Sequence, residues 1–111
     1  MDLLKGTLDV LVLRSLAGGA RHGYAVARWI RASSEDVLVV EDRALYLSLH
    51  RLEARGEVES EWGTSENGRR ARYYRLTRSG RKQLKSEEKL WTEYAGAVFR
   101  VLRADPRKEV S

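Results

Sequence analysis

The chain of 111 residues has no cysteine, a single proline and only two histidines, His22 and His50. Without cysteine it can form neither disulfide bonds nor thiolate metal sites, and we expect no bound metal. No glycine-rich loop followed by Lys-Ser or Lys-Thr occurs, so residues suited to catalysis are scarce and neither an enzyme nor a cofactor is expected. An apolar run long enough to span a bilayer and a signal-peptide pattern are also absent, which favours a cytoplasmic protein.

Charge, by contrast, is abundant: 33% of the residues are charged and the formal net charge is +5. The positive charge is concentrated between Asn67 and Lys82, where there are seven basic residues and no acidic one. A charge run of this kind is usually a solvated surface, so its meaning depends on the elements that carry it. The length suits one small globular core.

A short helical pattern precedes the basic run. Leu45, Leu49 and Leu52 recur at helical spacing and predict one buried face, with Glu41 or Asp42 as the N-cap and Gly56 as the stop. The opposite face is expected to carry these exposed side chains: Arg43, Leu47, His50, Arg51 and Ala54.

The basic run itself has the pattern of a hairpin, in which EVESEW and ARYYRL alternate around the loop GTSENGRR. A two-residue Asn-Gly turn would place Arg75 on the apolar face. We therefore expect a bulged or longer tip that pairs Trp62 with Tyr74 and Glu61 with Arg75. Trp62 is expected in the core, as is Trp29.

Two helical patterns precede these elements. LLKGTLDVLVLRSLA is apolar on nearly every side and predicts a central helix that stops at Gly18-Gly19, with Thr7 as an alternative N-cap within the stretch. HGYAVARWIRASS predicts a second helix with a broad apolar stripe. In the GGARHG segment between them, a tight turn explains the glycines better than phosphate binding does, and His22 is interpreted as a cap or packing residue.

A long last helix is predicted from Arg78 to Ala104, with Thr77 as its N-cap. It is longer than the core of so small a domain requires, so its spare surface needs a partner. Trp91 could line a small-molecule pocket, but aromatic residues at helical spacing are more often packing residues. Apolar residues at heptad or offset positions predict a short dimer seam: Leu84, Trp91, Tyr94, Val98 and Val101.

An amphipathic helix with exposed arginines directly before a basic hairpin is typical of a small DNA-binding domain. In such a domain Arg43 and Arg51 would bond guanine edges or phosphates in the major groove, and Leu47 would contact a thymine methyl group. Three hairpin arginines would follow the backbone or enter the minor groove: Arg69, Arg70 and Arg72.

Three stretches resemble the PadR family of bacterial transcriptional regulators: GTLDVLVLRSLAGGARHGYAVARWI, LYLSLHRLEARGEVESEW and GRRARYYRLTRSGR. The resemblance implies a winged helix-turn-helix domain, a dimer formed through the C-terminal helix, and repression of genes under a small-molecule or stress signal. It also implies that Tyr46 contacts the DNA backbone. Leu47 stands where the family commonly has proline, and Arg43 occupies a place where small residues are common, so the sequence preference is expected to differ.

We therefore predict an α+β, mainly α fold, with a winged helix-turn-helix domain over residues 1–77, a dimerisation helix over 78–104 and a flexible tail over 105–111.

The leading hypothesis is a homodimeric repressor that binds a palindromic operator in double-stranded DNA, with a small aromatic effector as a further candidate partner. The alternative is a protein-interaction module that docks a partner through its last helix. A dimer of the isolated chain favours the first, and a monomer the second. Binding to a membrane surface is a weaker third hypothesis, since the arginines do not follow one amphipathic helix.

Overall fold

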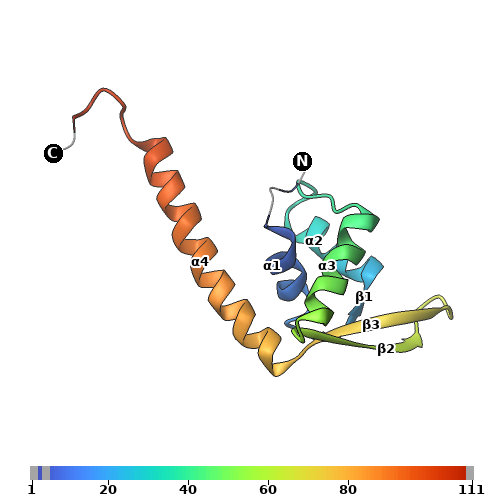
Figure 1. Ribbon diagram of the computed structural model, residues 1–111. Helices are drawn as coiled ribbons and strands as arrows, with labels where there is room; N and C mark the ends of the chain where they lie inside the picture. Colours follow the sequence, from blue (N-terminus) through green and yellow to red (C-terminus); the bar gives the residue numbers. More distant parts are fainter. Residues whose placement is uncertain (1–2, 4–5, 110–111) are drawn as a thin grey trace.

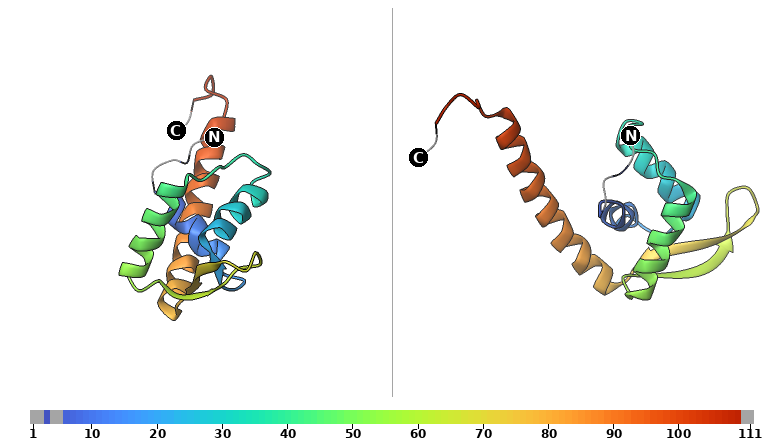
Figure 2. Two further views of the ribbon diagram at one scale, coloured as in Figure 1. Left: turned by 90° about the vertical axis from the view of Figure 1, so that its right-hand side faces the viewer. Right: turned by 45° about the horizontal axis from the view of Figure 1, so that its top comes forward.

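The computed structural model describes residue 3 and residues 6–109, which form four helices and a three-stranded antiparallel sheet of order β1-β3-β2 (Figure 1). The elements are α1 (Leu8–Ser15), β1 (Arg21–His22), α2 (Gly23–Ser33), α3 (Asp42–Ala54), β2 (Val58–Thr64), β3 (Arg70–Leu76) and α4 (Arg78–Arg103). Helices α1 to α3 form a body, from which the β2–β3 hairpin extends on one side and α4 on the other (Figure 2). This confirms the predicted α+β, mainly α winged helix-turn-helix fold with its long last helix.

The central helix is α1, as its apolar pattern predicts. It packs against α2, α3 and α4, and its Val12 and Leu13 are fully buried together with Leu45 and Leu49 of α3. The helix is shorter than the apolar stretch, because the φ of +85° at Gly6 takes the chain out of a helical path. The N-cap position is Thr7, although its side chain forms no capping hydrogen bond. Leu4 and Lys5 of the predicted helix lie outside the described residues.

Helix α2 begins after a side-chain cap, which provides a hydrogen-bond acceptor for a backbone N–H group of the first turn. The Nδ1 atom of His22 accepts a hydrogen bond from the Ala25 backbone N–H at 3.1 Å, which confirms that His22 is a cap. Its ring also lies 5.4 Å from the Tyr73 ring, edge to face, so the cap packs against β3. Trp29 on the same helix is partly buried against the core, as predicted.

The hairpin pairs in a different register from the predicted one. Trp62 lies opposite Arg72 and Ser60 opposite Tyr74, so the predicted Trp62–Tyr74 pair is wrong by two residues. The tip is the longer loop that was expected, over residues 65–69, and the Ser65 N–H donates to the Arg69 carbonyl at 2.7 Å. Because strands alternate with a period of two, a shift of two residues keeps every side chain on its predicted face. Arg75 accordingly points outward.

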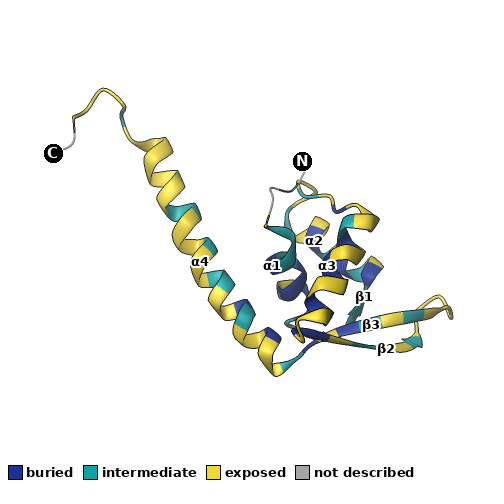
Figure 3. Cartoon of the chain, viewed as in Figure 1, coloured by how far each residue is buried: buried dark blue, intermediate teal, exposed yellow. Residues whose placement is uncertain are grey.

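The prediction that Trp62 belongs to the core is wrong, since 56% of it is exposed. The two strands run past the body, and only the half nearest the helices is covered (Figure 3). Val58, Tyr74 and Leu76 share the face of Trp62 and are buried, because they lie at the covered end. The alternating pattern therefore predicts correctly which face of the hairpin each side chain occupies. How far along the hairpin the helices cover that face depends on the tertiary structure.

Helix α4 begins at its predicted cap and ends within one residue of its predicted end. The Thr77 hydroxyl oxygen accepts a hydrogen bond from the Gly80 N–H at 3.0 Å. Leu84 is buried and Trp91 packs against the core, after which the helix leaves the body and its side chains are mostly exposed (Figure 3). No helix among the described residues is both long and apolar enough to cross a membrane.

Residues 105–109 follow α4 as an irregular segment. Here the Arg107 side chain binds the Asp105 carboxylate at 3.1 Å. The last two residues of the predicted tail, 110 and 111, lie outside the described part of the chain.

Candidate nucleic-acid interface

The start of α2, the exposed face of α3 and the hairpin enclose a concave surface with a volume of about 680 Å³. Five of the predicted DNA-contacting residues line it, namely Tyr46, His50, Arg69, Arg70 and Arg72. Among the other lining residues are three from the β1–α2 segment that the sequence did not assign to binding: His22, Tyr24 and Arg28. The capping role of His22 and the helical spacing of Tyr24 had suggested only packing there.

Tyr46 is held at this surface by its contact with α2. A Cβ atom built on Gly23 would lie 2.8 Å from the Tyr46 hydroxyl oxygen, so the phenol approaches as closely as a residue without a side chain permits. The ring remains partly exposed. The glycine of the His-Gly-Tyr triplet thus sets the position of a side chain that lies more than twenty residues later in the chain.

The outer face of α3 carries the predicted side chains Arg43, Leu47 and His50, all exposed. The inner face holds Leu45, Leu49 and Leu52 in the core, which confirms the helical pattern. Arg43 and Leu47 do not line the concave surface but lie on the adjoining outer face of the helix. An exposed helix beside a concave basic surface has the shape that enters a major groove.

The hairpin arginines differ in how they are held. The guanidinium of Arg70 lies 4.5 Å from the centre of the Trp62 ring, a cation–π contact that orders an otherwise exposed side chain. Arg72 donates to the Ser60 hydroxyl oxygen at 2.8 Å and lies 3.5 Å from the Glu53 carboxylate. Arg69 is exposed at the end of the loop. Arginine and aromatic side chains at one concave face suit a polyanion with planar bases.

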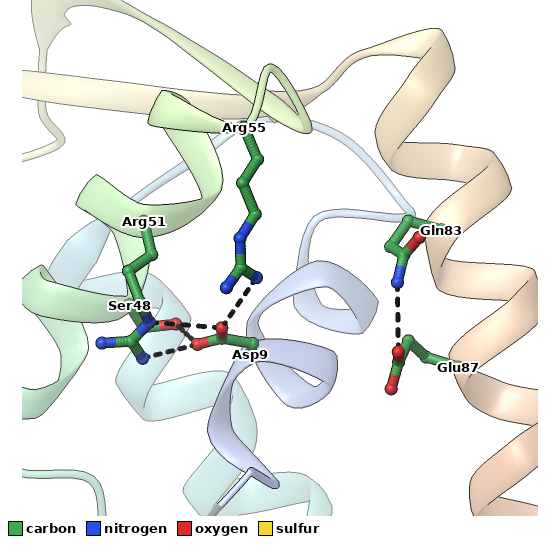
Figure 4. A network of polar contacts seen from close by, with 6 residues as sticks. All are labelled: Asp9, Ser48, Arg51, Arg55, Gln83 and Glu87. Carbon is green, nitrogen blue, oxygen red and sulfur yellow. Dashed lines mark hydrogen bonds and ion pairs between the residues drawn. The ribbon is translucent and has the colours of Figure 1, made fainter.

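Arg51 is turned away from this surface and toward α1 (Figure 4). Its Nη2 donates to Asp9 Oδ1 at 2.7 Å and its Nε donates to Asp9 Oδ2 at 3.3 Å, a two-point contact that occupies the guanidinium edge. This geometry argues against the base-reading role predicted for Arg51. No local pattern indicates this ion pair, because the partner of Arg51 is 42 residues away on another helix.

The same carboxylate accepts hydrogen bonds from the Ser48 hydroxyl at 2.6 Å and from Arg55 Nη1 at 3.5 Å. Burial by itself would raise the pKa of Asp9, but the hydrogen bonds from Arg51 and Ser48 and the nearby arginine charges lower it below the ordinary value of 3.8. Asp9 is therefore a carboxylate held in its charged form between α1 and α3.

The model of the transcriptional regulator PadR-like family matches residues 12–86, more than half of the chain. The chain belongs to this family. Similar solved structures agree with the architecture of this PadR-like protein. A transcriptional regulator from Clostridium thermocellum is 29% identical with a TM-score of 0.77, over 86% of this chain and 93% of that one. A PadR family regulator from Clostridium difficile is 27% identical with a TM-score of 0.75, over 87% and 99%.

Among sequences, an uncharacterized protein of Lysinibacillus sphaericus is 29% identical over 92 residues, which are 83% of this chain and 84% of that protein. A PadR-like regulator from Bacillus cereus, at 22% identity and a TM-score of 0.78, shows the same fold. The matched residues 12–86 include the concave surface and the first turns of α4.

The distal half of α4 in this PadR-like protein carries a row of exposed apolar side chains. Of the predicted seam residues, Tyr94, Val98 and Val101 are exposed, and Trp91 packs edge to face on Tyr94 at 6.0 Å. Leu84 does not fit the prediction of an interface residue, because it is already buried in the core of its own chain. Four exposed residues that the heptad spacing did not select extend the row: Leu90, Phe99, Leu102 and, toward the polar side, Ala97.

Proposed function

We propose that this PadR-like transcriptional regulator is a homodimeric, sequence-specific repressor controlled by a small-molecule or stress signal. In this proposal residues 1–77 bind double-stranded DNA and residues 78–104 form the dimer. The observation that carries the proposal is the concave basic surface between α3 and the hairpin, which joins five of the predicted contact residues. A bacterial repressor with a helix in the groove and an adjacent basic hairpin binds through both elements.

In the complex, α3 would lie in the major groove, with Arg43 and His50 facing base edges or phosphates and Leu47 against a thymine methyl group. Tyr46 would donate its hydroxyl to a phosphate, since Gly23 holds the phenol at the edge of the concave surface. The hairpin arginines would lie along the backbone or in the minor groove and add affinity that depends on salt: Arg69, Arg70 and Arg72.

The dimer is supported by the exposed apolar row on α4, which no other described element of the chain covers. Two copies of the row packed against each other would bury it and relate the two α3 helices by a two-fold axis, as a palindromic operator requires. The same row also favours a second candidate function, docking of an unrelated protein partner. The mass of the isolated chain in solution separates the two, because only the self-complementary row gives a dimer without a partner.

A small aromatic effector would find rings beside which to stack at Trp91 and Tyr94, at the foot of the exposed row. Quenching of tryptophan fluorescence across a set of aromatic compounds tests this site. The variant Trp91→Ala is the control, because Trp29 and Trp62 also emit. Quenching that persists in the variant would contradict a site at Trp91.

The proposed function is tested by binding of the purified chain, with its mass in solution determined, to DNA from its own upstream region and to a scrambled duplex. We expect a dimer that prefers its own region by about a hundredfold or more, within the range of specific regulators. Equal binding to both duplexes would contradict sequence-specific regulation. Absence of binding at low salt, by a monomer, would favour the protein-docking function.

The hairpin is tested in the same titrations by the triple variant Arg69→Ala, Arg70→Ala and Arg72→Ala. Each lost phosphate contact should flatten the slope of log affinity against log salt by about 0.9. The matched control removes three exposed positive charges from α4, far from the concave surface: Lys85→Ala, Lys89→Ala and Arg100→Ala. An unchanged slope in the hairpin variant, or an equal change in the control, would contradict the proposed role.

A further inference from the structure

A cluster of charged side chains joins α1 to α3 outside the concave surface (Figure 4). Its centre is Asp9, in the first turn of α1, and around it lie Ser48 and Arg51 of α3 and Arg55 at the C-cap of the same helix. The Asp9 carboxylate is the acceptor in every one of these hydrogen bonds. Two arginines thus share one carboxylate, and the cluster keeps a net charge of about one positive unit by simple addition of formal charges.

The two arginines lie at the edge of the surface proposed to face DNA. Arg51 is one helical turn from Leu47 and next to His50, both on the exposed face of α3. Its side chain is 48% exposed and that of Arg55 is 56% exposed, while Asp9 is 24% exposed. Asp9 is therefore less exposed than its partner in each ion pair, and both arginine side chains are bent back onto it.

An arginine at this edge without a carboxylate partner would be long enough to bond a phosphate beside the groove that α3 enters. Such contacts carry no sequence information, because every duplex presents the same phosphates. The geometry of the cluster works against them in two ways. The Asp9 contact occupies one edge of the Arg51 guanidinium, and the negative charge offsets part of the attraction that phosphates exert on both arginines.

We propose that Asp9 is a specificity-determining residue, which holds Arg51 and Arg55 on α1 and so limits the sequence-independent affinity of α3 for DNA phosphates. This inference rests on the proposed DNA-binding function. The hydrogen bond from the fully buried Ser48 hydroxyl fixes the carboxylate on α3 and thus also fixes the seating of α3 on α1. The cluster therefore sets both the position of α3 and the number of arginine side chains that are free to bind phosphates at its edge.

The variant Asp9→Asn tests the inference in titrations with a scrambled duplex and with the upstream region. Release of one or two arginines should steepen the salt slope for scrambled DNA by about 0.9 to 1.8. We expect affinity for scrambled DNA at low salt to rise by about threefold to tenfold, and the preference for the upstream region to fall, because released cations add phosphate contacts on any sequence. The matched control is Asp105→Asn, which removes a carboxylate from an exposed Asp–Arg pair beyond α4. A slope for Asp9→Asn equal to that of the control would overturn the inference.

A second variant keeps the inference testable if Asp9→Asn does not fold, as judged by circular dichroism. The double variant Arg51→Gln and Arg55→Gln removes both arginines and leaves the Asp9 carboxylate in place, where Ser48 still binds it. If the wild-type arginines are held on α1, this variant keeps the wild-type slope. A slope flatter than that of the wild type by about one or more would mean that Arg51 or Arg55 already binds phosphate, and would overturn the inference.

The wild-type titrations separate this inference from the proposed function. A wild-type chain that binds scrambled and upstream DNA equally contradicts sequence-specific regulation. A steeper salt slope for Asp9→Asn would even then support the inference that Asp9 keeps Arg51 and Arg55 away from DNA phosphates. A wild-type chain that prefers its upstream region, with an unchanged slope in Asp9→Asn, overturns the inference alone. If neither the wild type nor Asp9→Asn binds any duplex at low salt, both are overturned.

Discussion

At the scale of single residues, two carboxylates at the junction of α1, α3 and the hairpin have opposite effects. Asp9 accepts hydrogen bonds from Arg51 and Ser48, and its pKa is lowered despite partial burial. Glu57 is buried in the turn just before β2, and burial raises the pKa of its carboxyl group, although the charge of Arg55 acts in the other direction. The charged form of Asp9 therefore stabilises the fold, whereas that of Glu57 costs free energy.

The Asp9 cluster predicts a specific acid sensitivity. Because the folded-state pKa of Asp9 lies below the ordinary value of 3.8, its stabilising effect is present above that pH and is lost as the pH falls through the lowered pKa. Asp9→Asn should reduce the free energy of unfolding by about 1 to 2 kcal/mol at pH 7, and the difference from the wild type should shrink below about pH 4. Urea unfolding followed by circular dichroism at pH 7, 4 and 3 measures both values.

The control for this prediction is Asp36→Asn, which breaks an exposed ion pair with Arg31 at the end of α2. Exposed pairs contribute little, so this variant should lie within about 0.5 kcal/mol of the wild type at each pH. A difference between Asp9→Asn and the wild type that stays constant down to pH 3 would contradict the prediction.

At the scale of elements, the joint between the hairpin and α4 depends on close backbone packing. The Thr77 N–H donates to the Glu57 carbonyl at 3.1 Å, and the Thr77 hydroxyl donates to the Gly56 carbonyl at 2.6 Å while it caps α4. A Cβ atom on Gly80 would overlap the Glu57 carbonyl oxygen. The first turn of α4 thus lies against the turn between α3 and β2, and the direction of the long helix is set there.

This contact predicts that Gly80→Ala is destabilising even though alanine favours helices. The added methyl group must displace backbone atoms, and we expect the free energy of unfolding to fall by about 1 to 3 kcal/mol. The matched control is Gly96→Ala in the same helix, where the nearest atom to a built Cβ is 3.6 Å away. That variant should be as stable as the wild type or up to about 1 kcal/mol more stable. Thermal unfolding of both variants measures the contrast, and equal effects would contradict the role of Gly80.

At the scale of the whole molecule, the structure is an L-like arrangement of body and arm that extends 61 Å along its longest axis (Figures 1 and 2). The first half of the arm is fixed to the body by Leu84 and Trp91 and by the ion pair of Arg14 with Glu88 at 3.2 Å. The second half has a wide apolar row that remains exposed. Burial of the row against a second copy would be the main favourable contribution to the proposed dimer.

The arm predicts that one charge in the row prevents dimer formation. Val101→Glu places a carboxylate in the proposed interface, and we expect a monomer, with affinity for a palindromic duplex lower by on the order of a hundredfold because two linked half-sites no longer bind together. Lys89→Glu is the control, since Lys89 is exposed on the polar face of α4, opposite the row. Light scattering measures the mass. A dimer of Val101→Glu, or a monomer of Lys89→Glu, would contradict the proposed interface.

The sequence by itself determined the helices, the hairpin, the caps at His22 and Thr77, and the buried face of α3, because these depend on spacing and capping within a few residues. Only the tertiary structure decided the hairpin register, the exposure of Trp62 and the burial of Leu84. It also decided the partner of Arg51 on a helix 42 residues away. Each of these depends on which elements meet and how far the core extends, and a local pattern carries no information about contacts between distant segments.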